Sequence, residues 1–211
     1  MKKIILFITA LLLFNAGSVF AQKDPKAKKI LDRVKTIFKS HKTVQANFTF
    51  AIENKAEKIS ETQKGRFFMQ GNMFKVDMSE RLIICDGKNI WTYDKETNEV
   101  QINNYNLAED QLSPTRIFTL YDNGFNYTLV SEKGIEYVNL IPENKKKEIS
   151  QVKLFFDKQK TKIERAIISN KDGNLYTYTI QQMETNKTFA LDMFKFDKAK
   201  YPKVEIVDLR N

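Results

Sequence analysis

Side chains that commonly carry catalysis or bind metals are scarce in this sequence. Its 211 residues include one histidine, His41, and one cysteine, Cys85. One histidine is too few for a histidine-rich metal site, a Ser-His-Asp hydrolase triad would depend on His41 alone, and a zinc site built from cysteine pairs is excluded. His41 ends an amphipathic segment, where a cationic group is favourable at a helix C-terminus. Cys85 has apolar neighbours and is expected to be a small buried hydrophobe, with a reactive thiol as the alternative.

Carboxylates and phosphate-binding loops offer no clearer chemistry. No G-x-G-x-x-G or P-loop pattern occurs. Asp77 and Glu80 are close in sequence, but acidic residues are common in the turns of this chain, and nothing singles out an acid–base pair. We therefore expect a protein that is not an enzyme and that holds neither a cofactor nor a metal.

Aromatic and methionine side chains are abundant instead, with 16 Phe, 8 Tyr and 6 Met. An ordinary β core accounts for many of them. Methionine is also flexible and polarizable, and it is frequent on surfaces that accept varied apolar ligands. Met69, Met73, Met78 and Met183 are candidates for such a surface.

The first residues, "MKKIILFITALLLFNAGSVFAQ", have the pattern of a secretory signal peptide. Lys2 and Lys3 precede a short apolar run, and Val19-Phe20-Ala21 offers a cleavage site after Ala21. The run is shorter than the ~20 residues of a membrane span. We expect residues 1–21 to be removed and residues 22–211 to form a single domain that is exported, soluble and without a lipid anchor, because the residue directly after the cut, Gln22, is not a cysteine.

The net charge of +9 is carried mostly by lysines spread along turns and edges, with one run at Lys145-Lys146-Lys147. Two interpretations stay open for this run: a solvated turn, or attraction to an anionic membrane or an acidic partner surface. Nucleic acid is not expected as the partner of an exported protein.

Residues 24–41 are the clearest helix. Asp24 is placed to cap its start and Pro25 suits its first turn. The apolar residues recur at helical spacing and predict one buried stripe. They are Ala27, Ile30, Leu31, Val34, Ile37 and Phe38.

About eleven or twelve strands follow, joined mostly by short turns, which predicts an antiparallel meander. A sheet of this size encloses more volume than its own side chains fill. A second short helical segment is expected after Ser113-Pro114, so two helices could close the opening. The expected strands are 44–52, 59–69, 74–78, three within 82–102, 125–130, 135–141, 152–156, 163–168, 175–183 and 204–207.

The stretch "LIICDGKNIWTYDKETNEVQI", residues 82–102, is apolar on both strand faces. Asp86-Gly87 predicts a two-residue type I′ turn. Leu82 to Cys85 are consecutive apolar residues, whereas a sheet with one wet face should alternate. Because both faces are apolar, the sequence does not decide which face of these strands lines the cavity.

The same stretch, with "MFKVDM" before it, resembles the core of the LolA-type outer-membrane lipoprotein carrier proteins. The D-G-K-x-x-W-x-Y piece is the most specific part of the resemblance. "LSPTRIFTL", "GNLYTYTI" and "FKFDKAKYPKVEIVD" resemble later segments of the family and fall in the right order, so the resemblance spans nearly the whole mature chain.

The resemblance implies a mainly β fold with two helical lid segments, an incomplete (half-open) antiparallel β-barrel of about eleven strands enclosing an apolar cavity. It implies a periplasmic carrier that takes the acyl chains of lipoproteins from an inner-membrane ABC-type lipoprotein-releasing complex to an outer-membrane acceptor. We expect a monomer that approaches membranes only transiently.

Apolar residues of the alternating strands and of the lids are the expected cavity lining. The family often has Arg-Pro before the aromatic strand, as a latch between lid and barrel, and Gln70-Gly71 stands there in this chain. The expected lining residues are Leu31, Phe48, Phe50, Phe67, Met69, Phe74, Val76, Met78, Trp91, Ile117, Phe118, Val152, Leu154 and Phe156.

Two other functions fit the same residues. One is a periplasmic lipid or small-hydrophobe binding protein with the same half-barrel, not dedicated to lipoproteins. The other is a structural module that binds nothing.

Overall fold

The computed structural model describes residues 23–106, 121–122 and 124–210. Within them the chain forms helix α1 (Pro25–Ser40), twelve strands, and two short 3-10 helices, η2 (Leu191–Phe194) and η3 (Lys198–Lys200). The expected signal peptide, residues 1–21, and the expected helical segment after Ser113 lie outside the described residues. The strands are β1 (Thr43–Asn54), β2 (Ile59–Gln70), β3 (Met73–Met78), β4 (Arg81–Cys85), β5 (Asn89–Asp94), β6 (Glu99–Asn104), β7 (Phe125–Glu132), β8 (Ile135–Pro142), β9 (Ile149–Phe156), β10 (Ile163–Asn170), β11 (Leu175–Thr185) and β12 (Glu205–Asp208).

Helix α1 is confirmed almost to the residue. The Asp24 carboxylate accepts a hydrogen bond from the Lys26 backbone N–H at 2.8 Å, which makes Asp24 the N-cap, and proline occupies the first turn. His41 is the C-cap, and its backbone N–H donates to the Phe38 carbonyl. The predicted apolar stripe is buried except at Ile37, which is half-buried.

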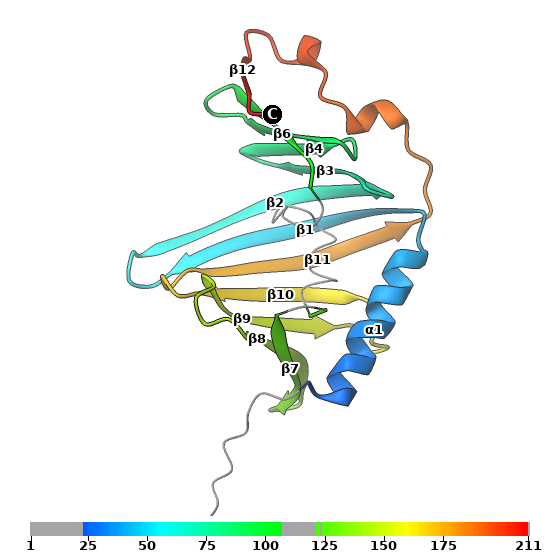
Figure 1. Ribbon diagram of the computed structural model, residues 1–211, viewed down its shortest axis with the longest axis vertical. Coiled ribbons are helices and arrows are strands. Elements are labelled where there is room, and N and C mark those ends of the chain that lie inside the picture. Colours follow the sequence, from blue (N-terminus) through cyan, green and yellow to red (C-terminus); the bar gives the residue numbers. More distant parts are fainter. Residues whose placement is uncertain (1–22, 107–120, 123, 211) are drawn as a thin grey trace, which may run out of the picture.

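The twelve strands form one open sheet in the order β12-β6-β5-β4-β3-β2-β1-β11-β10-β9-β8-β7. Two meanders run outward from the middle, where β1 pairs with β11, and the edges β12 and β7 do not meet (Figure 1). Neighbouring strands are antiparallel except β12, which lies parallel to β6. The expected half-open β-barrel is therefore confirmed, and the expectation of a purely antiparallel meander is corrected at this edge.

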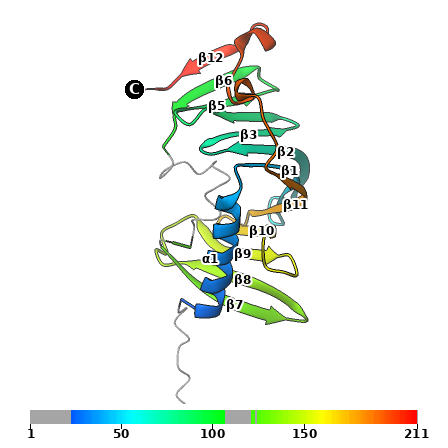
Figure 2. The same cartoon turned by 90° about the vertical axis from the view of Figure 1, so that its right-hand side faces the viewer.

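The sheet has a lid face, on which α1 packs, and an outer face opposite to it. Side-on, α1 runs along β7 to β11 and ends near β1, which leaves β3 to β6 beyond its end (Figure 2). Under the helix, Ala27, Ile30, Leu31 and Val34 pack with apolar residues of β7 to β10. Phe38 alone of the stripe reaches the neighbouring cluster, which is formed by β1 to β5.

The outer face of β4 to β6 is covered by the C-terminal segment. After β11 the chain runs back along the sheet to its far edge and ends in β12 (Figure 1). Phe196, Tyr201 and Val204 of this segment pack on outer-face residues of the sheet. The outer-face residues are Leu82, Ile84, Trp91, Tyr93 and Val100.

This cover explains why residues 82–93 are apolar on both faces. Ile83, Cys85 and Ile90 belong to the lid-face cluster, while the residues between them meet the C-terminal segment. Cys85 is fully buried, as expected for a small hydrophobe.

The turn between β4 and β5 differs from the prediction. Asp86 still pairs with Asn89, so the two-residue loop is Gly87-Lys88. Of these two, Gly87 has a positive φ, +88°, and Lys88 does not, which is the pattern of a type II′ turn. The Asp86 carboxylate accepts hydrogen bonds from the Lys88 and Asn89 backbone N–H groups, which lowers the pKa of Asp86 against the effect of its burial.

Candidate functional site

Cross-strand rows of apolar side chains run across the lid face. In an antiparallel sheet, directly paired residues project from the same face, so each row is a continuous strip. One row crosses six strands, from the β7 edge to the middle of the sheet. Its members, each paired with the next, are Leu129, Val138, Leu154, Ala166, Tyr178 and Phe50.

Helix α1 covers only one end of these rows. Val138 and Leu154, under the helix, are completely buried, whereas the Tyr178 side chain is 38% exposed. Around Tyr178, apolar side chains of β1, β3 and β11 are half-buried. We call this set the aromatic strip: Phe50, Ile52, Met78, Tyr176, Tyr178 and Ile180.

The aromatic strip is ordered by ring contacts. The Phe50 ring centroid lies 4.9 Å from that of Tyr178 and 6.1 Å from that of Tyr176, with which it is stacked. Burial raises the pKa of the Tyr178 hydroxyl, so this group stays neutral near pH 7. The strip is therefore an uncharged, largely apolar surface, suited to hydrocarbon.

A groove of about 680 Å³ opens where the strip approaches α1. Its apolar lining includes Ile30, Leu129, Phe156 and Ile180, and its rim carries charges of both signs, among them Arg165. The volume falls within the range of small-molecule sites, about 300–1,000 Å³. An apolar floor with a charged rim suits a ligand that is itself amphipathic.

Polar contacts pin α1 to the chain around β7. Asp24 donates its backbone N–H to the Tyr127 carbonyl at 3.0 Å, and its carboxylate accepts from the Leu129 N–H at 2.9 Å. The Leu129 hydrogen bond is the main cause of the lowered pKa of Asp24. Farther along the helix, Tyr121 donates its hydroxyl to Asp32.

The electrostatics along the helix follow from these pairs. The ammonium of Lys28 lowers the pKa of Asp32, and the Tyr121 hydroxyl adds to that effect. Burial, followed by the hydrogen bond to Asp32, raises the pKa of Tyr121 far above its usual value. Lys35 forms an ion pair with Asp122. The cover over β7 to β10 is thus held by backbone, carboxylate and ion-pair contacts.

A family comparison identifies this architecture. The family model of the outer membrane lipoprotein carrier protein LolA matches residues 39–197, which is most of the chain. The chain belongs to the LolA family.

Curated relatives in this family agree over nearly their full length. An outer-membrane lipoprotein carrier protein of Nitrosomonas europaea is 25% identical over 198 residues, covering 90% of this chain and 95% of the relative. Another, from Legionella pneumophila strain Lens, is 26% identical over 206 residues, covering 92% and 95%.

Solved structures share the fold at low sequence identity. An uncharacterized conserved protein from Thermus thermophilus aligns with a TM-score of 0.54 and 14% identity, covering 87% of this chain and 99% of that one. This similarity shows that the two chains share a fold.

Most of the residues expected to line a LolA cavity lie on the lid face. Leu31, Val152 and Leu154 are buried beneath α1, with Phe156 packed against them. Ile117 and Phe118 lie outside the described residues. The other expected residues on this face belong to or pack against the cluster of β1 to β5: Phe48, Phe50, Phe67, Met69, Phe74, Val76 and Met78.

Two of the expected site residues, Trp91 and Gln70, do not lie on the lid face. Trp91 packs in the outer-face cluster beneath the C-terminal segment, so the prediction that it lines the cavity is wrong. Met69 is on the lid face, so strand alternation directs Gln70 to the outer face. Gln70 Oε1 is buried and accepts no hydrogen bond from the described residues. The expected latch is corrected accordingly: Asp24, Asp32 and Lys35 hold the helix.

Sequence reasoning missed four of the six residues of the aromatic strip. The expected lining residues did not include Ile52, Tyr176, Tyr178 and Ile180. A signal was present, because "YTYTI" in residues 176–180 alternates large and small side chains as a one-faced strand does.

Metal-ligating side chains are not gathered together in the described part of the chain. Its histidine, cysteine and acidic side chains form no group of three that could hold a metal ion. No helix among the described residues is long and apolar enough to cross a membrane. The description of the matching family names a carrier of lipoproteins.

Proposed function

We propose that this protein carries lipoproteins through the periplasm by holding their acyl chains on the aromatic strip and the adjoining lid face. It receives them from an inner-membrane ABC-type lipoprotein-releasing complex and delivers them to an outer-membrane acceptor. In this proposal residues 1–21 direct export and residues 22–211 are the working domain. Family membership and the names of the curated relatives support the proposal.

The observation that carries the proposal is the half-exposed aromatic strip beside the fully buried rows under α1. A soluble chain gains nothing in stability by leaving Phe50, Tyr178 and Ile180 partly in water. An acyl chain laid along the strip would remove that surface from water. The strip is continuous with the groove beside Ile30 and Leu129, which extends the apolar path towards the helix.

Release is the physical difficulty for such a carrier. An acyl chain of about 15 methylenes gains roughly 12 kcal/mol when it is fully buried, at ~0.8 kcal/mol per methylene. Several chains held at full value would not leave. An acyl chain that lies on the open strip keeps part of its own surface in water and therefore gains only part of that free energy. Handover to a more apolar acceptor can then proceed without ATP at that step.

The test compares two neighbouring positions of β1 on opposite faces. Phe50→Asp places a carboxylate in the aromatic strip, where it must be desolvated on loading, and Thr49→Asp places the same charge on the outer face. Both variants are incubated with a diacylated lipoprotein and with free phospholipid, and the bound material is measured by mass spectrometry. We expect Phe50→Asp to lose lipoprotein loading at least tenfold and Thr49→Asp to retain it.

Two results would contradict the proposal. Normal lipoprotein loading by a folded Phe50→Asp variant would remove the strip from the carrier site. Loading of free phospholipid, with none of lipoprotein, by the unchanged protein would assign it to the class of periplasmic lipid binders instead.

A further inference from the structure

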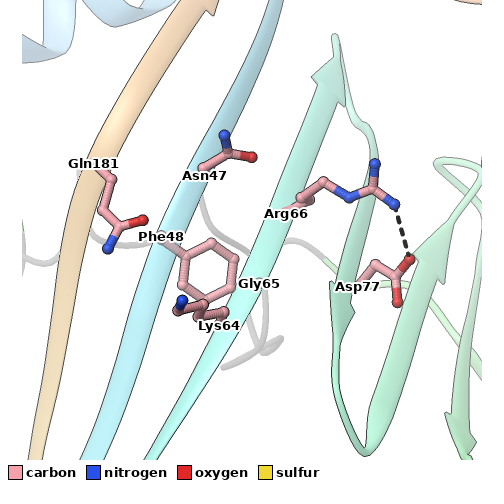
Figure 3. Close-up of a pocket in the computed structure, with 7 residues that line it drawn as sticks. All are labelled: Asn47, Phe48, Lys64, Gly65, Arg66, Asp77 and Gln181. Atoms are coloured by element: carbon pink, nitrogen blue, oxygen red, sulfur yellow. Dashed lines mark ion pairs between the residues drawn. The ribbon is translucent and has the colours of Figure 1, made fainter.

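The outer face of the sheet carries a second hollow, separate from the aromatic strip. It has a volume of about 390 Å³ and lies where β11, β1, β2 and β3 run side by side (Figure 3). Lys64 and Arg66 are two residues apart on β2 and therefore project from the same face, about 7 Å apart along the strand. The lining residues are Asn47, Phe48, Lys64, Gly65, Arg66, Asp77 and Gln181.

The charge balance of this pocket is positive. Asp77 is its one acidic lining residue, and Asp77 Oδ1 already accepts a hydrogen bond from Lys95 Nζ at 2.7 Å. Arg66 Nη2 lies 3.8 Å from the other oxygen of Asp77, which is an ion pair but too long for a hydrogen bond (Figure 3). With Asp77 compensated by Lys95, the charges of Lys64 and Arg66 are in surplus.

Hydrogen-bond donors in the pocket are also uncommitted. Among the described residues, neither the Lys64 nor the Arg66 side chain donates a hydrogen bond, and the Gln181 amide has no protein partner. Asn47 Nδ2 reaches only Gln182 Oε1, at a long 3.4 Å. Gln181 is the residue that the bulge between β1 and β11 leaves without a paired partner, and it borders the pocket for that reason.

We propose that this pocket binds a phosphate group, presented either by a phospholipid headgroup or by a free phosphate ion. Two cations and two amides on three strands match a tetrahedral oxyanion, which offers several acceptor oxygens in different directions. An apolar ligand would leave these donors unpaired, and a cationic ligand would be repelled. The acyl cargo occupies the opposite face, so both sites can be filled at once.

The test uses the full mature chain in phosphate-free buffer. Inorganic phosphate is titrated by calorimetry, and phosphatidylglycerol vesicles are titrated by co-flotation, for the unchanged protein and for Lys64→Gln/Arg66→Gln. The control variant Lys29→Gln/Arg33→Gln removes the same charge from the exposed side of α1. Circular dichroism establishes that all three proteins are folded.

We expect the unchanged protein and the control to bind, and the pocket variant to bind at least about tenfold more weakly. Binding of inorganic phosphate identifies the free ion as a ligand, and binding of vesicles without it identifies the headgroup. Absence of binding to both probes, or equal weakening in the pocket and control variants, would overturn the proposal.

Discussion

Gly65 shows how a missing side chain shapes the lid face. It lies opposite Phe48 in the β1–β2 pairing, and the Phe48 ring rests over the glycine backbone. A Cβ atom at position 65 would lie 2.4 Å from Phe48 Cζ, which is closer than any van der Waals contact allows. The ring therefore fills the space that a side chain would occupy.

Gly65→Ala is expected to destabilise the protein by roughly 1–3 kcal/mol, because the buried Phe48 ring must leave its position. Urea denaturation followed by circular dichroism measures the change. The double variant Gly65→Ala/Phe48→Leu should recover part of the loss, since a smaller side chain leaves room for the new methyl group. A Gly65→Ala protein as stable as the unchanged one would show that the ring moves at no cost.

Single residues show which side chains the sequence could assign to the correct face of the sheet and which it could not. Phe48, Phe50 and Met78 were placed correctly because their strands alternate apolar with polar side chains. Trp91 was not, because both faces of its strand are apolar and alternation cannot choose between them. The missing information was the C-terminal segment, which covers the outer face from about 100 residues away along the chain.

At the scale of elements, α1 is a cover fixed at its N-terminal end. The two carboxylate oxygens of Asp24 have different tasks: Oδ1 caps the helix through Lys26, and Oδ2 accepts from Leu129 on the edge strand β7. The same residue therefore starts the helix and blocks part of a sheet edge, where unpaired backbone groups invite aggregation. On the lid face, α1 leaves the aromatic strip partly exposed.

Asp24→Asn is expected to lower stability at pH 7, because an amide has one acceptor oxygen for two donors. The folded pKa of Asp24 lies below the ordinary value of 3.8, so its contribution is present above about pH 4 and is lost as the pH falls through the folded pKa. The difference between the two proteins in urea midpoint should thus shrink between pH 7 and pH 3. Asp192→Asn, at an exposed carboxylate, is the control. A difference that does not change with pH would contradict this role.

The C-terminal segment acts as a strap over the outer face. The Tyr201 ring lies 4.6 Å from that of Tyr93 and is stacked 4.7 Å from that of Phe196. Only β12, after these rings, joins the sheet, and it does so in parallel to β6. The sequence predicted this strand as part of an antiparallel meander, and the predicted direction is wrong. Parallel and antiparallel pairing need the same alternating pattern, so alternation cannot tell them apart.

Tyr201→Ala is expected to cost roughly 1–3 kcal/mol, since it removes two ring contacts and uncovers part of the outer-face cluster. The chain has one tryptophan, Trp91, in this cluster, so its fluorescence emission should shift to longer wavelength in the variant. Tyr201→Phe keeps the ring and should leave both readouts unchanged. An unshifted emission in Tyr201→Ala would mean that the strap does not shield the cluster.

At the scale of the whole molecule, the two faces of one sheet carry different kinds of side chains. The lid face holds apolar rows that are buried at the helix and half-exposed at the aromatic strip. The outer face combines the strapped cluster at one end with the cationic pocket near the middle. Length, alternation and turn residues were enough to predict a large antiparallel meander, and the family resemblance implied the half-barrel. Predicting which side chains lie on which face would have required the long-range pairing of β1 with β11 and the path of the C-terminal segment.

The most direct test places a photoreactive benzophenone side chain at either of two neighbouring residues of β11, Tyr178 or Thr177. Tyr178 projects from the lid face beside Phe50, and Thr177 projects from the outer face, where it pairs with Ala51 and Ile167. Each protein is loaded with a lipoprotein that carries radiolabelled acyl chains and is then irradiated. The account predicts strong labelling at position 178 and at least tenfold less at position 177. Equal labelling at both positions, or labelling confined to position 177, would contradict the assignment of the lid face as the carrier site.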